Sequence, residues 1–179
     1  MAPCPPLIAR DQTMTLLDLP SDIAANPVDT IEHLAESNDW IFDRSSDDEI
    51  TISVDGHHCD YHVSFTWMEE IDGLHVACAF DFKVADRQRS EILELLAAIN
   101  EQLWIGHLDI WAKQSVIMFR QTLMLPEGGD ISRSQVELML RTAIDTCQRY
   151  YPAFQFVVWA GKSAKEALDA VLLETMGEA

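Results

Sequence analysis

Residues 49–83 read EITISVDGHHCDYHVSFTWMEEIDGLHVACAFDFK and carry the main signal for the fold. Apolar and polar residues alternate in three runs, over 49–54, 59–67 and 74–83. A period of two is typical of strands that bury one face. The stretch therefore predicts a three-strand antiparallel meander.

The turns between these runs set the expected register. Asp55-Gly56 is a signal for a two-residue hairpin loop. Such a loop keeps apolar residues opposite one another, and it places Ile50, Ile52 and Val54 opposite Tyr61, Cys59 and His57.

The second hairpin is expected to turn at Glu70–Gly73, which pairs Phe65 with Cys78 and Val63 with Phe80. A six-residue loop would also keep the faces matched. Both loops put Cys59 and Cys78 roughly 13–20 Å apart along the strands, too far for a disulfide. The four cysteines show no C-x-x-C spacing, so we expect reduced and mostly buried thiols.

Helix signals surround the meander. Asn26 and Pro27 open a helix that ends near residues 37–39, and Asp86 caps a long helix over 87–105 that Gly106 ends. A second, two-strand meander follows, with strands around 108–112 and 116–125.

The C-terminal third is expected to be helical in part. Ser132 and Gln135 have capping-box spacing at the start of one helix, and Ser163 with Glu166 opens a short final one. The stretch 150–160 stays open between helix and strand, because Pro152 disfavours a helix and the aromatic and β-branched content suits a strand.

These elements predict an α+β fold, with an antiparallel sheet of about five strands flanked by helices. Residues 26–176 form the expected domain. Residues 1–25, with three prolines in the first six positions, are expected to be a flexible tail. Its apolar patch, Met14–Leu19, either docks on the domain or a partner, or stays free.

The charge limits the classes of partner. The formal net charge is −18, from 30 acidic and 12 basic residues. Such a surface repels nucleic-acid backbones and anionic lipids and favours cationic or amphipathic partners. The chain has no apolar run near the ~20 residues of a membrane span and no secretory signal, so we expect a cytoplasmic protein.

One histidine cluster is a candidate site. His58, Asp60 and His62 share the polar side of an expected strand, and Glu49 and Asp81 flank His62 in the four-residue-loop register. The alternatives are a metal or acid–base site and a plain polar sheet face; we favour the second. No catalytic, cofactor-binding or metal-ligating residue is predicted.

Two other stretches of the sequence carry recognisable patterns. Gly161-Lys-Ser163 resembles the end of a phosphate-binding loop but lacks the earlier glycine, so we expect a turn between helices. The tryptophans Trp40, Trp67, Trp104, Trp111 and Trp159 are expected to lie mainly in the core, although a strand such as Trp111 to Phe119 is a candidate binding surface.

As a set, several segments resemble the YbjN family, and the order of elements resembles the fold of type III secretion chaperones. The segments are Cys59–His62, Cys78–Asp81, Asn100–Asp109, Met118–Arg120, Arg149–Phe156 and Trp159–Ser163. The resemblance runs from about residue 26 to the C-terminus. The family is labelled a sensory-transduction regulator and has no family active site.

The resemblance implies a homodimer that holds a partner polypeptide along an apolar surface, and it favours a helix through 150–160. Our leading hypothesis is a non-enzymatic protein-interaction module in sensory or stress regulation, without a cofactor. The alternative is a small metal- or ligand-binding enzyme that uses His58, Asp60 and His62.

Overall fold

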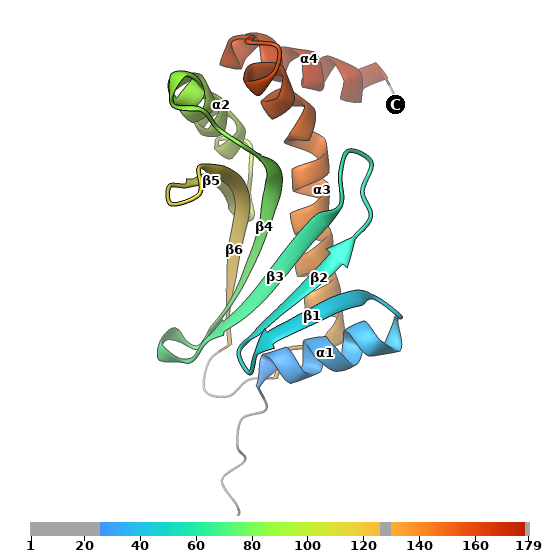
Figure 1. Ribbon diagram of the computed structural model, residues 1–179. Helices are drawn as coiled ribbons and strands as arrows, with labels where there is room; N and C mark the ends of the chain where they lie inside the picture. The colour runs from blue at the N-terminus through green and yellow to red at the C-terminus, as the bar shows by residue number, and fades with distance from the viewer. Residues whose placement is uncertain (1–25, 126–129, 178–179) are drawn as a thin grey trace, which may run out of the picture.

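The computed structural model describes residues 26–125 and 130–177, which form a six-stranded antiparallel sheet and helices packed against it (Figure 1). The strand order is β1-β2-β3-β4-β6-β5. The strands are β1 (Ile41–Ser46), β2 (Glu49–Val54), β3 (Tyr61–Met68), β4 (Gly73–Lys83), β5 (His107–Trp111) and β6 (Val116–Met124). The α-helices are α1 (Pro27–Ser37), α2 (Arg89–Asn100), α3 (Arg133–Val158) and α4 (Ala164–Gly177), and the 3-10 turns are η1 (Glu69–Ile71) and η2 (Asp86–Gln88).

The α+β class is confirmed, but the expected number of strands is one too low. The additional strand is β1, which forms the outer edge of the sheet beside β2. Its sequence, IFDRSS, has apolar residues only at Ile41 and Phe42. Edge strands tolerate such polar sequences because only one side pairs with a neighbour. A period-two search therefore does not find it.

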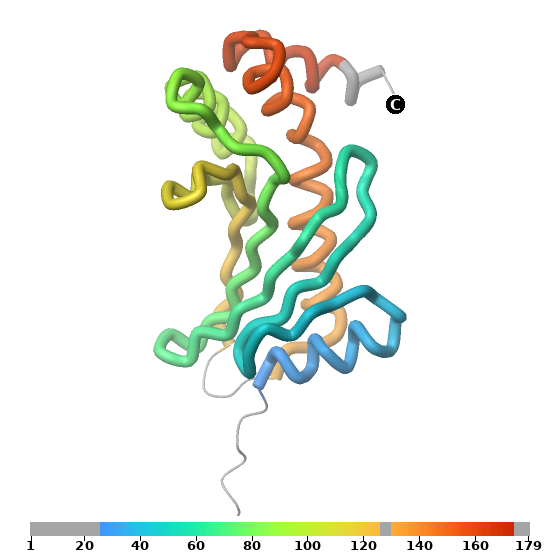
Figure 2. Tube along the Cα trace, viewed as in Figure 1, coloured from blue at the N-terminus to red at the C-terminus, as the bar shows by residue number. Residues whose placement is uncertain are grey.

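The core lies on one face of the sheet. The inward side chains of the strands, such as Ile52, Val63 and Phe119, are fully buried together with apolar residues of all four α-helices. Helix α3 runs along the whole of this face and contacts β3, β4 and β6 (Figures 1 and 2). The opposite side chains of the same strands therefore point away from the helices, and we call this side the open face.

The register expected for the first hairpin is wrong by four residues. Val54 pairs with Tyr61 and Ile52 with Val63, so residues 55–60 form a six-residue loop. Gly56 does not have the positive φ of a type I′ turn. It is needed for close approach instead, because a Cβ there would overlap the Tyr61 ring and lie 2.7 Å from the Cys59 carbonyl oxygen.

The second hairpin has a four-residue loop, but at Glu69–Asp72 rather than Glu70–Gly73. Met68 pairs with Gly73, which puts Phe65 opposite Val76 and Val63 opposite Cys78. Asp72 takes the left-handed conformation, with φ 48°, that closes this turn. Both errors are shifts by an even number of residues, so the residues that lie in β2, β3 and β4 keep the face that alternation predicts.

The helix starts at Asn26 and Ser132 agree with the capping signals, whereas Asp86 does not cap α2, whose N-cap is Gln88. The Asn26 side chain accepts a hydrogen bond from the Val28 N–H, and Ser132 and Gln135 form the complete capping box. The long helix predicted over 87–105 is wrong at both ends, since Asp86–Gln88 is a 3-10 turn and α2 ends at Asn100. Gly106 lies six residues beyond that end.

The open question at 150–160 is resolved in favour of a helix. Helix α3 runs through Pro152 to Val158 without a break. A proline inside a helix costs about 3 kcal/mol. Burial of the neighbouring Tyr150, Tyr151 and Phe154 offsets this cost, so tertiary packing overrides local propensity here.

Candidate functional site

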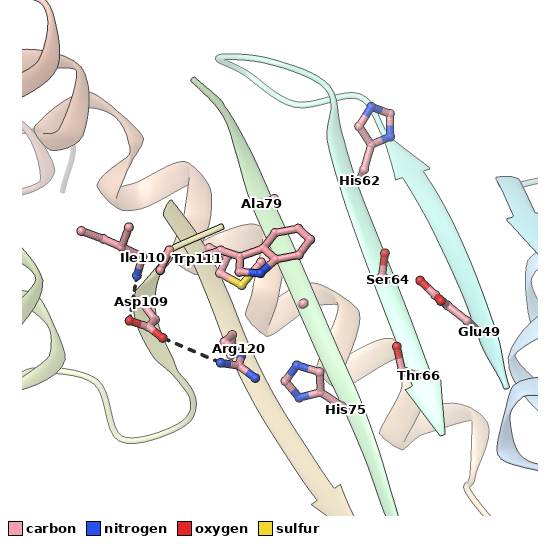
Figure 3. A pocket seen from close by; sticks show the side chains of 13 residues that line it. Glu49, His62, Ser64, Thr66, His75, Ala79, Asp109, Ile110, Trp111 and Arg120 are labelled. Carbon is pink, nitrogen blue, oxygen red and sulfur yellow. Dashed lines mark hydrogen bonds and ion pairs between the residues drawn. The ribbon is translucent and has the colours of Figure 1, made fainter. Parts of the chain in front are cut away.

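The open face carries a hollow of about 620 Å³ at its centre (Figure 3). It spans five strands, from Glu49 on β2 to Trp111 on β5, and its size lies in the usual range of ligand sites. We call this feature the hollow. It is the candidate site of the molecule.

Two alanines of β4 form the floor of the hollow. Ala77 lies between Ser64 and Arg120 of the neighbouring strands, and Ala79 lies between His62 and Met118. A methyl group between longer side chains leaves a depression, which explains why the hollow lies over β4. Trp111 forms one wall and is 41% exposed, so an aromatic face remains available to a ligand.

Polar groups line the rest of the hollow. Arg120 Nη1 lies 3.7 Å from Asp109 Oδ2, and both side chains are about half exposed. Asp109 Oδ1 also accepts a hydrogen bond of 2.7 Å from the Ile110 N–H. The hollow thus combines an apolar floor and wall with one cation and a few acceptors, the composition of a binding site rather than of a packed core.

His75 lines the hollow, and its pKa is shifted by its surroundings. Its Nδ1 lies 3.1 Å from Thr122 Oγ1. Burial lowers the pKa of His75, and the positive charge of the neighbouring Arg120 and the proximity of His107 lower it further. His75 therefore stays neutral in the folded protein at pH values where it is already partly protonated in the unfolded chain.

We expect this shift to make stability depend on pH. The unfolded chain binds the proton more readily, so the contribution of His75 is complete above its unfolded pKa of about 6.5 and is lost as pH falls toward the lower folded pKa. Urea unfolding of wild type and His75→Gln at pH 8 to 5 measures it. Wild type should lose more stability than the variant between pH 7 and 5; parallel curves would contradict the assignment.

The predicted histidine row is wrong. Glu49 lies opposite Thr66, which in turn lies opposite His75, whereas His62 lies opposite Ser53 and Ala79. Glu49, His62 and Asp81 therefore do not share a row. Asp81 instead accepts a hydrogen bond of 2.7 Å from the Tyr151 hydroxyl group. The misplaced hairpin turns are the reason for the error.

His58, Asp60 and His62 do not share one strand either. His58 and Asp60 belong to the loop before β3, and His58 stacks on Tyr151 of α3 with ring centroids 5.2 Å apart. His62 lies on the open face and bonds to Ser53. Within residues 26–125 and 130–177, no three or more His, Cys, Asp or Glu side chains are grouped so as to hold a metal ion.

The thiols lie on the helix side of the sheet. Cys59, Cys78 and Cys147 are free, as predicted for the pair Cys59 and Cys78, and Cys4 lies outside the described residues. Burial raises the pKa of Cys59 and of Cys147 above the ordinary value. These thiols are therefore weak nucleophiles at neutral pH.

The glycine motif is a turn, as expected. Gly161 has φ 65° between α3 and α4, and Glu166 accepts hydrogen bonds from the Ser163 N–H and hydroxyl group. The Ala164 N–H donates to Glu91 of α2. The start of α4 is thus satisfied by carboxylates of the protein.

Sequence reasoning singled out the Trp111–Phe119 region, and the structure brings Trp111 together with the small residues Ala77 and Ala79 in the hollow. Phe119 is buried on the other face. Reasoning from the sequence missed His75, Asp109 and Arg120 as lining residues. These three residues alternate with buried ones along β4, β5 and β6. Only the order of these strands in the sheet, β4-β6-β5, brings the three side chains together.

No helix in the described part of the chain combines the length and the apolar character of a membrane span. A search of curated proteins found no match. Among solved structures, the chain is similar to "Crystal structure of YbjN, a putative transcription regulator from E. coli", with a TM-score of 0.50 and 11% sequence identity. The similarity covers 68% of this chain and 85% of that chain, and at this identity it shows the fold alone.

A family model covers most of the domain. The model is YbjN, described as "Putative bacterial sensory transduction regulator", and it matches residues 27–156. The matched range begins at the first residue of α1 and ends two residues before the end of α3, so it includes all six strands and the hollow. On this match, the chain belongs to the YbjN family.

Proposed function

We propose that the protein is a non-enzymatic interaction module of a regulatory system, and that it binds an extended segment of a partner protein in the hollow. The observation that carries this proposal is the hollow itself: an apolar floor and an exposed tryptophan on a sheet face that the helices leave uncovered. Tryptophan is enriched among the residues that dominate binding energy. The description of the family as a regulator supports a binding role.

The polar groups of the open face favour binding over catalysis. Ser53 Oγ lies 3.0 Å from His62 Nδ1, a pair that resembles part of a catalytic triad. A triad needs a third group that orients the base. In the described residues no carboxylate bonds to the second ring nitrogen of His62, and Ser53 does not line the hollow. The pair therefore fixes the position of His62 on the sheet surface.

The outer edge of β5 is closed to an added strand. The Asn100 side chain accepts from the Leu108 N–H at 2.8 Å and donates to the Leu108 carbonyl oxygen at 3.0 Å. The next outward N–H, that of Ile110, donates to Asp109. These bonds use the backbone groups that strand addition would need. We therefore place the partner across the open face rather than along this edge.

The charge of the chain narrows the chemistry of the partner. Glu49 and Asp109 line the hollow in a chain of net charge −18. Such a surface speeds encounter with basic or amphipathic segments and slows encounter with acidic ones. We propose a partner segment with apolar side chains for the floor and wall and with basic residues that approach the acidic surroundings.

Replacing Trp111 by aspartate is expected to abolish partner capture. Losing a tryptophan that dominates an interface costs at least 2 kcal/mol, or about 30-fold in affinity. Pull-downs with tagged full-length wild type and Trp111→Asp, compared by quantitative mass spectrometry, measure the loss. Circular dichroism checks that the variant is folded.

The matched control is Trp104→Asp. Trp104 is 99% exposed and does not line the hollow, so the same chemical change there should leave the captured proteins unchanged. Equal capture by wild type and Trp111→Asp would refute the proposed site. The homodimer implied by the chaperone resemblance stays a prediction, which light scattering of the full chain would test.

A further inference from the structure

A second cleft, of about 410 Å³, lies where α2, α3 and α4 meet (Figure 1). Its volume is within the usual range of small-molecule sites. It shares no lining residue with the hollow, so a ligand there leaves the hollow free for a partner. The lining residues come from the start of α2 with its preceding turn and from the end of α3 with the turn to α4: Arg87, Gln88, Glu91 and residues 157–162. We call this feature the basic cleft.

The turn at the end of α3 positions Lys162 at the cleft. Gly161 takes the left-handed conformation, with φ 65°, and the Lys162 N–H donates a hydrogen bond of 3.1 Å to the Phe156 carbonyl oxygen. The chain thus turns back toward α3, and Lys162 Nζ lies 4.5 Å from the centroid of the Phe156 ring. A cation–π contact of this kind positions an ammonium group without neutralising it. The charge of Lys162 therefore stays available to a ligand.

Two carboxylates near these cations are bound to the start of α4. Glu91 and Glu166 accept hydrogen bonds of 2.9 and 3.0 Å from backbone N–H groups there. Hydrogen bonds from Ser163 and the nearby charge of Lys162 lower the pKa of Glu166. Among the described residues, neither Arg87 nor Lys162 forms an ion pair. The lining of the cleft therefore has two cations against one carboxylate, that of Glu91.

The negative end of α3 is covered as well. The last carbonyl groups of a helix carry a partial negative charge, which repels an anion. Gln88 Nε2 donates to the Val157 carbonyl oxygen at 3.4 Å and also to the Val158 carbonyl oxygen. The distant acidic residues of the chain act weakly here, because charges are screened beyond about 8 Å at physiological ionic strength. The cleft thus keeps a positive local charge.

Trp159 adds an aromatic surface at the same place. Its ring centroid lies 5.7 Å from that of Phe82, which supports the indole, yet Trp159 is 64% exposed. Exposed aromatic rings stack with planar ligands, and guanidinium and ammonium groups bind carboxylates and phosphates. We therefore propose that the basic cleft binds a small ligand whose planar ring stacks on Trp159 and whose anionic group is held by Arg87 and Lys162. Nucleotides and aromatic acids share this chemistry.

NMR titration of the isotope-labelled full-length protein tests the proposal. Each of the five tryptophans gives one indole N–H signal, and Trp159→Phe identifies that of Trp159. Adenosine monophosphate probes a phosphate ligand and naphthoate a carboxylate ligand, with adenosine and naphthamide as their neutral counterparts. We expect at least one anion to shift the Trp159 signal and to bind at least about tenfold more tightly than its neutral counterpart. Binding of adenosine monophosphate alone supports a nucleotide, and binding of naphthoate alone supports an aromatic acid.

Variants of the two cations complete the test. Arg87→Gln and Lys162→Gln should each weaken binding of that anion at least about fivefold, because each removes one charge-assisted contact. Lys113→Gln is the matched control, since Lys113 is exposed and lines neither site, and it should bind like wild type. No shift of the Trp159 signal with either anion, a shift of the Trp111 signal instead, or unchanged affinity in both cation variants would overturn the proposal. Unchanged backbone signals far from the cleft verify folding of each variant.

Discussion

Phe119→Ala is expected to lower the free energy of unfolding by about 3–5 kcal/mol, the largest effect of a single substitution that we predict. Phe119 is fully buried at the centre of β6, between Cys78 of β4 and Leu108 of β5. Removing the ring leaves a cavity under the strand that also carries Met118 and Arg120. A domain of this size is stable by only about 5–15 kcal/mol, so the variant should be close to unfolding.

Urea denaturation followed by circular dichroism measures the change. The matched control is Met124→Ala at the end of the same strand, where the side chain is 57% exposed and the loss should stay within about 0.5 kcal/mol. A loss below about 1 kcal/mol for Phe119→Ala would contradict the assignment of Phe119 to the centre of the core.

Gly106→Ala is expected to lower the free energy of unfolding by about 2–4 kcal/mol. Gly106 has φ 69°, which is strained for any residue with a side chain. A Cβ there would also overlap the ring of Phe119 and lie 2.9 Å from the Arg120 carbonyl oxygen. The cost of the left-handed conformation and the cost of the steric overlap are separate, so we expect their sum to exceed either one alone.

Gly161→Ala separates the two contributions. Gly161 has a similar φ of 65°, but a Cβ there would meet no atom within 4 Å. Its loss should be about 1–2 kcal/mol, the cost of the left-handed conformation alone. Thermal or urea unfolding of both variants gives the difference. Equal losses of unfolding free energy in the two variants would contradict the close packing of Gly106 on Phe119.

The faces of the strands could be predicted from the sequence, but the hairpin registers could not. Alternation assigned Ile52, Val63 and Cys78 to the buried side, and all three are fully buried there. Any shift by an even number of residues keeps these faces, so alternation cannot choose among such registers. The Asp55-Gly56 signal then selected the wrong one, because Gly56 allows the approach of Tyr61 instead of forming the tight turn.

The remaining errors in the fold have tertiary causes. β1 is too polar for a period-two search, because it is an edge strand with no buried side chain. Helix α2 ends at Asn100, and the Asn100 side chain joins this end to the start of β5 through two hydrogen bonds with the backbone of Leu108. Pro152 inside α3 is tolerated because aromatic residues around it are buried.

The candidate site was only partly predictable. The polarity of the open face and the small size of Ala77 and Ala79 are visible in the sequence. The tryptophans were expected mainly in the core, with the Trp111–Phe119 strand as a candidate binding surface; Trp111 lines the hollow, whereas Phe119 is buried on the other face. The hollow itself depends on the strand order. β6, not β5, pairs with β4, and this pairing brings Arg120 beside Ala77. Strand order is not encoded in alternation, and neither is register, so the two misplaced hairpin turns put the histidine row in the wrong place.

The most direct test of the account is photo-cross-linking of the full-length protein in the cells that make it. p-Benzoylphenylalanine replaces Met118 in the hollow or, as a control, Leu138, which is 53% exposed on α3. We predict a discrete cross-linked product with another protein from position 118 and none from position 138. No product from position 118, a product only with a second copy of the chain, or equal products from both positions would contradict the account.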